Sequence, residues 1–266
     1  MQMNRIGVSS GCFYPRLTET VIKDITLTGA SVMELFINTH SEMENDYIKE
    51  LKEIIDYYGI SVCSVHPFTS FAETYLFFSE YPRRTEDGFR IYDRYFEICN
   101  ILGAKILNFH GFKSEKSIEF EKYCHVYGTL YEKAKAAGVV FSQENVRKFI
   151  SGDIEFIRRF SDYMKNSVAF TFDIKQAYMS GYDPIEFSKT VVDKLVLVHL
   201  NDFDGENTCL LPGKGVFDLQ TFFTDLSLSG YTGNYIIEVY SGVYDNDTEI
   251  ADSVKYAESI LKESLL

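Results

Sequence analysis

The stretch TEDGFRIYDRYFEICNILGAKILNFH, residues 85–110, contains the structural repeat of this chain. Residues 85–102 place apolar side chains three and four positions apart, which is typical of an amphipathic helix. Gly103 follows, at the kind of position where helices commonly end in a left-handed conformation. Residues 106–110 are a short apolar run typical of a buried strand. The stretch therefore predicts a helix that leads directly into a strand.

The same alternation recurs along the whole chain. Strands are predicted at residues 6–10, 32–36, 61–66, 106–110, 139–144, 169–173, 195–200 and 235–239. Helices are predicted at residues 17–28, 46–58, 85–102, 119–137, 153–164, 184–190, 219–229 and 248–262. Strict alternation of strand and helix implies parallel strands joined by right-handed crossovers.

The length suits a closed barrel. Eight units in 266 residues average about 33 residues each, and the chain is slightly longer than the ~250 residues typical of such a barrel. We therefore predict a single (β/α)8 TIM barrel forming one domain over residues 1–266. The alternative is an open doubly wound sheet. Against it, the first strand is followed by SSGCFYP, which lacks the glycine-rich phosphate loop of such sheets.

Composition excludes several classes of protein. Lys and Arg number 26 against 39 Asp and Glu, a net charge of −13 that repels nucleic acid and anionic membrane surfaces. We expect no membrane span, since no run of 18 apolar residues occurs. The N-terminus does not resemble a signal peptide, and the five cysteines form no CxxC pair. We expect a cytoplasmic protein with reduced thiols; a homo-oligomer is compatible with the sequence.

Polar side chains gather at the ends of the later predicted strands. Catalytic groups of (β/α)8 barrels come from these carboxyl ends. The residues in question are His66, His110, Glu144, Asn145, Asp173, Gln176, His199, Asn201, Asp202 and Glu238. Three carboxylates, Glu144, Asp173 and Glu238, would crowd one mouth of the barrel and need a compensating cation. Together with one neutral imidazole they predict one divalent metal, with Mn²⁺, Mg²⁺ or Co²⁺ favoured and Zn²⁺ compatible.

The order and spacing of several motifs resemble the xylose-isomerase-like (β/α)8 barrel superfamily. That superfamily includes sugar isomerases and epimerases, inosose-processing enzymes and endonuclease IV-type repair nucleases. The resemblance extends over nearly the whole chain. Its motifs are MELF at 33–36, VHPF at 65–68, SQEN at 142–145, FDIKQA at 172–177, HLNDFDG at 199–205, LPGKGVFDLQTFF at 211–223 and GYTGNYIIEVY at 230–240.

The resemblance implies a site and a reaction. It makes Glu144, Asp173, His199 and Glu238 the metal ligands, and it makes His66 a substrate contact. In the epimerase branch, the two metal-bound glutamates lie on opposite faces of a sugar and exchange its proton next to a carbonyl through an enediolate. The implied activity is a divalent metal-dependent sugar isomerase or epimerase, with Glu144 and Glu238 as its acid/base pair and a small sugar or polyol as its substrate.

The chain also departs from the patterns of this superfamily. The sugar-epimerase branch usually carries DxxH after strand 6, whereas here Gln176 stands in place of the histidine. Gln176 can bind a hydroxyl group but cannot carry a proton. The trinuclear-zinc nucleases need that histidine and another after strand 7, and residues 204–212 contain none. A repair nuclease is therefore disfavoured. Two alternatives stay open: a metal-dependent keto-sugar or keto-inositol lyase or dehydratase, and a non-enzymatic sugar-binding relative.

Several residues carry two interpretations each. His110 either contacts substrate or packs behind the site, and Glu34 either binds substrate or is buried with a partner. Lys175 either stabilises an enediolate or phosphate or pairs with a nearby acid. The aromatic segment 67–84 is either a binding loop or a packed surface excursion. The sequence shows no obvious second cluster of metal ligands, so it favours proton exchange over a hydride shift, which usually enlists a second metal.

Overall fold

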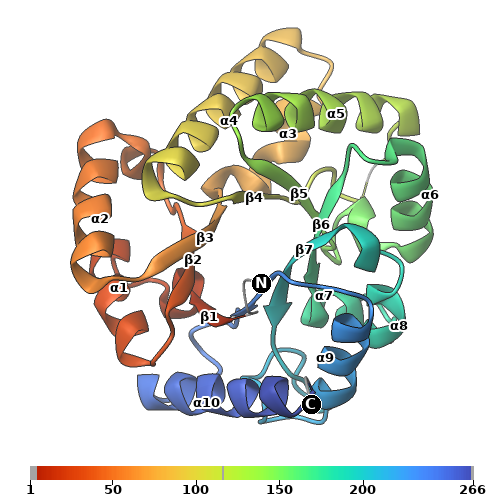
Figure 1. The fold of residues 1–266 in the computed structure, drawn as a ribbon. Coiled ribbons are helices and arrows are strands. Elements are labelled where there is room, and N and C mark those ends of the chain that lie inside the picture. Colours follow the sequence, from red (N-terminus) through yellow and green to blue (C-terminus); the bar gives the residue numbers. More distant parts are fainter. Residues whose placement is uncertain (1–4, 116, 265–266) are drawn as a thin grey trace.

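The eight strands form a closed parallel barrel. A computed structural model describes residues 5–115 and 117–264, and within them the strands follow one another around the barrel in chain order (Figure 1). The barrel closes because β1 pairs with both β2 and β8. The (β/α)8 prediction is confirmed, and the open-sheet alternative is wrong. The strands are β1 (Ile6–Ser9), β2 (Val32–Phe36), β3 (Ser61–His66), β4 (Ile106–Phe109), β5 (Val140–Glu144), β6 (Ala169–Asp173), β7 (Leu195–Leu200) and β8 (Asn234–Ile237).

Helices surround the barrel as an outer ring, in which α10 lies between α9 and α1 (Figure 1). The helices are α1 (Thr18–Leu27), α2 (Asn45–Tyr58), α3 (Glu73–Phe77), α4 (Pro82–Leu102), α5 (Phe120–Ala136), α6 (Ile154–Met164), α7 (Ile174–Met179), α8 (Pro184–Ser188), α9 (Leu219–Leu228) and α10 (Asp247–Ser264). Every predicted helix is present within a few residues of its expected ends. The short helices α3 and α7 were not predicted: α3 lies inside the aromatic segment 67–84, and α7 begins directly after β6.

The stretch that defines the repeat folds as its pattern predicts. Helix α4 begins at Pro82, three residues before the predicted start, because proline fits the first turn of a helix. It ends at Gly103, whose φ of 80° lies in the left-handed region that glycine tolerates. The chain then enters β4 at Ile106. The pattern of residues 85–110 thus correctly predicts where α4 ends and where β4 begins.

Strand alternation separates two layers inside the barrel. Ile106 on β4, Leu197 on β7 and Ile236 on β8 belong to one apolar cluster in the barrel interior. Two residues further along each strand lies a polar side chain: Asn108, His199 and Glu238, respectively. Because side chains two positions apart point to the same face of a strand, the barrel has an apolar floor and a polar layer towards its carboxyl end.

The outside of the barrel packs against the helices through aromatic side chains. Phe109 and Phe141 on the barrel lie 5.0 Å apart between ring centroids, and Tyr92 on α4 lies 6.0 Å from each. Such contacts account for much of the high Phe and Tyr content. The five cysteines are free and buried, as expected.

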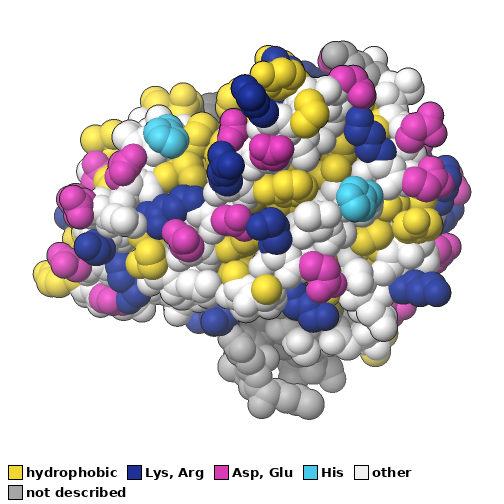
Figure 2. Space-filling view, turned by 90° about the horizontal axis from the view of Figure 1, so that it is seen from above, with side chains coloured by type: hydrophobic (Ala, Val, Ile, Leu, Met, Phe, Trp, Pro, Cys, Tyr) yellow, Lys and Arg dark blue, Asp and Glu magenta, His cyan; other side chains and the backbone are white. Residues whose placement is uncertain are grey.

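The surface carries charges of both signs. Figure 2 shows Lys and Arg interspersed with Asp and Glu over one side of the molecule, without a broad region of a single sign. Within the described residues, no helix has the length and apolar character needed to cross a membrane.

Candidate active site

Four predicted ligands come together at the carboxyl end of the barrel. Glu144 ends β5, Asp173 ends β6, His199 lies on β7 and Glu238 directly follows β8. Each offers one ligand atom, and these atoms all lie within 4.8 Å of one another. The quartet therefore occupies four consecutive strands, with the two glutamates at the ends of the row.

His199 aims one ring nitrogen at the three carboxylates of the quartet. Its Nδ1 lies 3.2 Å from Glu238 Oε2, 3.5 Å from Glu144 Oε1 and 3.9 Å from Asp173 Oδ2, yet it makes no hydrogen bond. The ring is fully buried. A buried nitrogen facing three acceptors needs either a proton or a metal ion between them.

Glu34 is a buried hydrogen-bond partner of other residues of the site rather than a substrate contact. Its Oε2 accepts hydrogen bonds from Ser64 Oγ at 2.9 Å and Asn108 Nδ2 at 2.7 Å, and it lies 3.2 Å from His199 Nε2. Its Oε1 accepts from Ser9 Oγ at 3.3 Å. An ionised carboxylate only accepts hydrogen bonds, so Nε2 is the nitrogen that donates to Glu34, and Nδ1 is the nitrogen that a metal in the quartet would use.

Asp173 is held by hydrogen bonds on every side. Asn145 clamps its backbone, donating from Nδ2 to the Asp173 carbonyl at 2.9 Å and accepting the Asp173 N–H at 2.7 Å. Asp173 Oδ1 accepts from Asn201 Nδ2 and from the Gln176 N–H, each at 3.1 Å. The sequence placed both asparagines at strand ends without revealing this role, which depends on side-chain direction.

Lys175 pairs with nearby acids, as one of its two interpretations predicted. Its ammonium lies 2.6 Å from Asp173 Oδ2 and 2.9 Å from Glu238 Oε2, and the side chain is 3% exposed. These are the two oxygens that Asp173 and Glu238 direct at His199 Nδ1. A buried cation thus touches two of the four predicted metal ligands.

The electrostatics of the quartet favour a cation. Burial opposes ionisation of Glu144 and Glu238, but neighbouring positive groups hold the pKa of each carboxyl well below its ordinary value. Burial would also lower the pKa of His199, but the surrounding carboxylates raise it well above its ordinary value. Burial is the main reason that the pKa of Asp173 rises to about 6. The carboxylates thus create a strongly negative potential at His199 Nδ1.

A cavity of about 360 Å³ opens above the quartet. Glu144 and Glu238 line it, whereas Asp173 and His199 do not and are completely buried. All four residues predicted to contact substrate also line it: His66, His110, Lys175 and Gln176. The volume falls within the range of small-molecule sites.

A second group of ligand-type side chains corrects one expectation. His66, His110 and Glu144 also bring ligand atoms within 4.8 Å of one another, although the sequence showed no second cluster. The His66 and His110 Nε2 atoms are 3.0 Å apart, and His110 Nε2 lies 3.2 Å from Glu144 Oε2. The two rings can therefore hydrogen-bond each other through these nitrogens, whereas Glu144 Oε2 has no hydrogen-bond partner among the described residues. The lack of a second cluster no longer argues against a hydride shift.

The segment 67–84 combines its two predicted roles. Ser70 lines the cavity, while Phe77 packs against Tyr92 with ring centroids 5.1 Å apart. Glu73 anchors the segment, because its buried carboxylate accepts the backbone N–H of His110 at 2.8 Å and that of Gly111 at 2.5 Å. No sequence pattern pointed to Glu73, which lies among aromatic residues.

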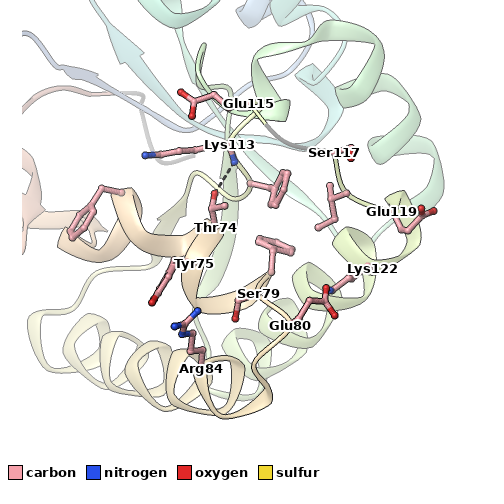
Figure 3. A pocket seen from close by; sticks show the side chains of 14 residues that line it. Thr74, Tyr75, Ser79, Glu80, Arg84, Lys113, Glu115, Ser117, Glu119 and Lys122 are labelled. Atoms are coloured by element: carbon pink, nitrogen blue, oxygen red, sulfur yellow. Dashed lines mark hydrogen bonds and ion pairs between the residues drawn. The ribbon is translucent and has the colours of Figure 1, made fainter.

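A larger cavity lies apart from the quartet, between α3 and the segment before α5 (Figure 3). It measures about 650 Å³, and none of the predicted site residues lines it. Three of its charged side chains are engaged with neighbours: Lys122 pairs with Glu80 at 2.9 Å, and the Arg84 guanidinium lies 3.8 Å above the Tyr75 ring. Volume alone therefore does not locate the site, and we assign it to the smaller cavity.

The quartet fits a divalent metal on its own chemistry. Three carboxylates and one imidazole form a hard, oxygen-rich ligand set suited to Mn²⁺, Mg²⁺ or Co²⁺ and also acceptable to Zn²⁺. The unpartnered Nδ1 of His199 is the specific observation that supports the fit. Glu34 supplies the outer contact that such histidines usually have.

Comparisons with known proteins agree with this architecture. A 3-keto-D-glucoside 4-epimerase from E. coli has a TM-score of 0.78 at 17% identity, covering 96% of this chain and 99% of that one. A D-psicose 3-epimerase from Clostridium cellulolyticum H10 has a TM-score of 0.80 at 15% identity, covering 97% and 99%. The IOLI protein, whose structure contains a bound zinc atom, has a TM-score of 0.78 at 15% identity, covering 98% and 99%. At these identities the likeness shows the fold alone.

The comparison with curated protein sequences finds no match. A family model, in contrast, matches residues 22–260, which include all four residues of the quartet. The chain therefore belongs to the xylose isomerase-like TIM barrel family.

Proposed function

We propose that this protein is a divalent metal-dependent sugar isomerase or epimerase. The observation that carries the proposal is that only part of the quartet reaches the cavity. Glu144 and Glu238 reach the cavity, whereas Asp173 and His199 lie buried behind it. Two carboxylates of one ligand set thus face the space where a substrate would bind.

Glu144 and Glu238 are the proposed acid/base pair. They stand at the two ends of the row of four strands that carries the quartet, and both line the cavity, which supports an approach to a bound sugar from its two sides. One glutamate removes the proton from the carbon next to a carbonyl, and an enediolate forms. Delivery by the other glutamate from the opposite face inverts that carbon, while delivery to the neighbouring carbon isomerises the sugar.

A metal bound by Glu144, Asp173, His199 and Glu238 would polarise the carbonyl and acidify the adjacent C–H bond. The chain supplies the remaining functions. His66 and His110 form one wall of the cavity and offer ring nitrogens to substrate hydroxyls. Gln176 accepts the Arg147 N–H through Oε1 at 3.0 Å, which orients its amide beside the cavity.

A substrate screen tests the proposal. The protein, supplied with Mn²⁺, is incubated with a panel of ketohexoses and keto-inositols, and the products are identified by NMR. Formation of an epimer or aldose–ketose isomer supports the proposal. Loss of water would instead indicate the lyase or dehydratase alternative, and sugar binding without conversion would indicate a non-enzymatic relative.

Two variants test whether any activity found in the screen belongs to this cavity. Glu144→Gln should remove it, whereas Glu97→Gln should not, since Glu97 is an exposed partner of Arg94 on α4. Equal activity in both variants would exclude this cavity as the site.

A further inference from the structure

We propose that Lys175 is a built-in competitor of the metal, whose ammonium neutralises two ligand oxygens of the quartet and thereby weakens metal binding. The inference rests on the proposed metal centre and adds a control of its affinity. Among the described lysines and arginines, the side chain that forms ion pairs with both Asp173 and Glu238 is that of Lys175.

The contacts of Lys175 place its charge against two of the oxygens that would bind the metal. Its Nζ bonds Asp173 Oδ2 and Glu238 Oε2, the same oxygens that approach His199 Nδ1. The other oxygen of Asp173 is already occupied by Asn201 and the Gln176 N–H. Asp173 therefore has one oxygen to offer, and the lysine and a metal must share it.

The surroundings of Lys175 keep its charge in place. The side chain is 3% exposed, and the Tyr240 ring lies 5.6 Å from Nζ on the cavity side. Both Lys175 and Tyr240 line the cavity. A metal bound to the same carboxylates would lie within a few ångströms of this ammonium, where two cations repel several times more strongly than in water.

The arrangement has a further consequence for the metal-free protein. Three clustered carboxylates repel one another, and Lys175 offsets part of that repulsion. The lysine thus stabilises the site before a metal arrives and opposes the metal when it binds. A weak and readily exchanged metal is the expected result.

Metal affinity of variants tests the inference without reference to catalysis. Mn²⁺ binding is measured by calorimetry for the wild type, Lys175→Met and Lys175→Arg. We expect Lys175→Met to bind Mn²⁺ at least about tenfold more tightly than the wild type, because the competing charge is gone. Lys175→Arg keeps the charge and should stay close to the wild type. Lys133→Met, which removes a lysine paired with Asp93 at 2.8 Å outside the site, is the matched control and should change nothing.

Every outcome bears on the inference. Should Lys175→Met prove too unstable to purify, Lys175→Gln removes the charge while keeping a donor, and it should also bind more tightly. If the wild type binds Mn²⁺ and loses it on Glu238→Gln, but the neutral variants bind no more tightly, the metal centre stands and the competitor role is overturned. If no variant binds a metal, both the metal centre and this inference fall.

Discussion

The Nε2 atom of His199 lies 3.2 Å from the Oε2 atom of Glu34, and both side chains are fully buried although they are far apart in the sequence. The contact spans the barrel interior from β7 to β2. An ionised Glu34 accepts a hydrogen bond from Nε2, and Nδ1 on the other side of the ring is directed at the three carboxylates. A metal bound by Nδ1 on one side of the ring would therefore depend on the carboxylate on the other side.

The first prediction follows from that contact. Glu34→Gln should lower Mn²⁺ affinity by roughly 10- to 100-fold, the usual cost of losing an outer contact to a ligating histidine. Calorimetric titration measures the effect. Glu50→Gln, an exposed position on α2, serves as the control. Unchanged affinity in Glu34→Gln would show that Glu34 does not orient His199.

The second prediction concerns the two glutamates that face the cavity. Glu144→Gln and Glu238→Gln should each lower turnover by roughly 10²–10⁴-fold, the scale of general acid–base catalysis, and by more where the metal is lost as well. Metal analysis of protein purified without chelator should show the metal reduced or absent in Glu238→Gln. Full metal content in that variant would remove Glu238 from the ligand set.

The third prediction concerns pH and Glu73. Burial raises the pKa of this carboxyl from its ordinary 4.5 to about 7, so the folded protein holds a proton that the unfolded chain releases. Stability therefore falls as the pH rises from about 4.5 to 7, by up to about 3 kcal/mol from this group. Glu73→Gln mimics the protonated acid and lacks this loss.

Urea unfolding of the wild type and Glu73→Gln between pH 5 and pH 8 measures the effect. The difference in free energy of unfolding should move in favour of the variant as the pH rises. Parallel curves across this range would show that Glu73 is ionised throughout in the folded protein.

The fourth prediction concerns the clamp on Asp173. Asn145→Ala leaves a buried N–H and a buried carbonyl of Asp173 without their partner, which should cost about 2–4 kcal/mol of stability. Asn100→Ala removes an exposed bond to the Ala137 carbonyl and should cost less than about 1 kcal/mol. Denaturant unfolding measures both losses. Equal losses of stability in the two variants would mean that the buried hydrogen bonds of Asn145 contribute no more than the exposed bond of Asn100.

The repeat at residues 85–110 shows why the fold could be predicted from sequence. Helical periodicity, a terminal glycine and a short apolar run are local properties, and Gly103 does end α4 before β4. The same local logic predicted Glu144, Asp173 and Glu238 at strand ends, because parallel strands bring their carboxyl ends to one edge.

The roles of Glu34 and of the His66–His110 pair depend on geometry that the sequence does not contain. Strand pairing shifts register between Met33 and Glu34 where β2 meets β3, and this shift helps set the position of Glu34. His66 and His110 meet across β3 and β4, so their contact depends on the register of two strands and on ring orientation. The five residues of α3 are too few to show helical periodicity among the aromatic residues around them, so the anchoring role of Glu73 was not predicted.

We propose that Glu144 and Glu238 move a proton on and off a sugar carbon. Conversion of the sugar found in the substrate screen is therefore run in D₂O with Mn²⁺, and the product is analysed by NMR and mass spectrometry. We expect solvent deuterium at the carbon that is inverted or that receives the shifted proton, because a carboxylate exchanges its proton with solvent between abstraction and return. Full conversion with no deuterium in the product would contradict proton transfer and indicate a hydride shift instead.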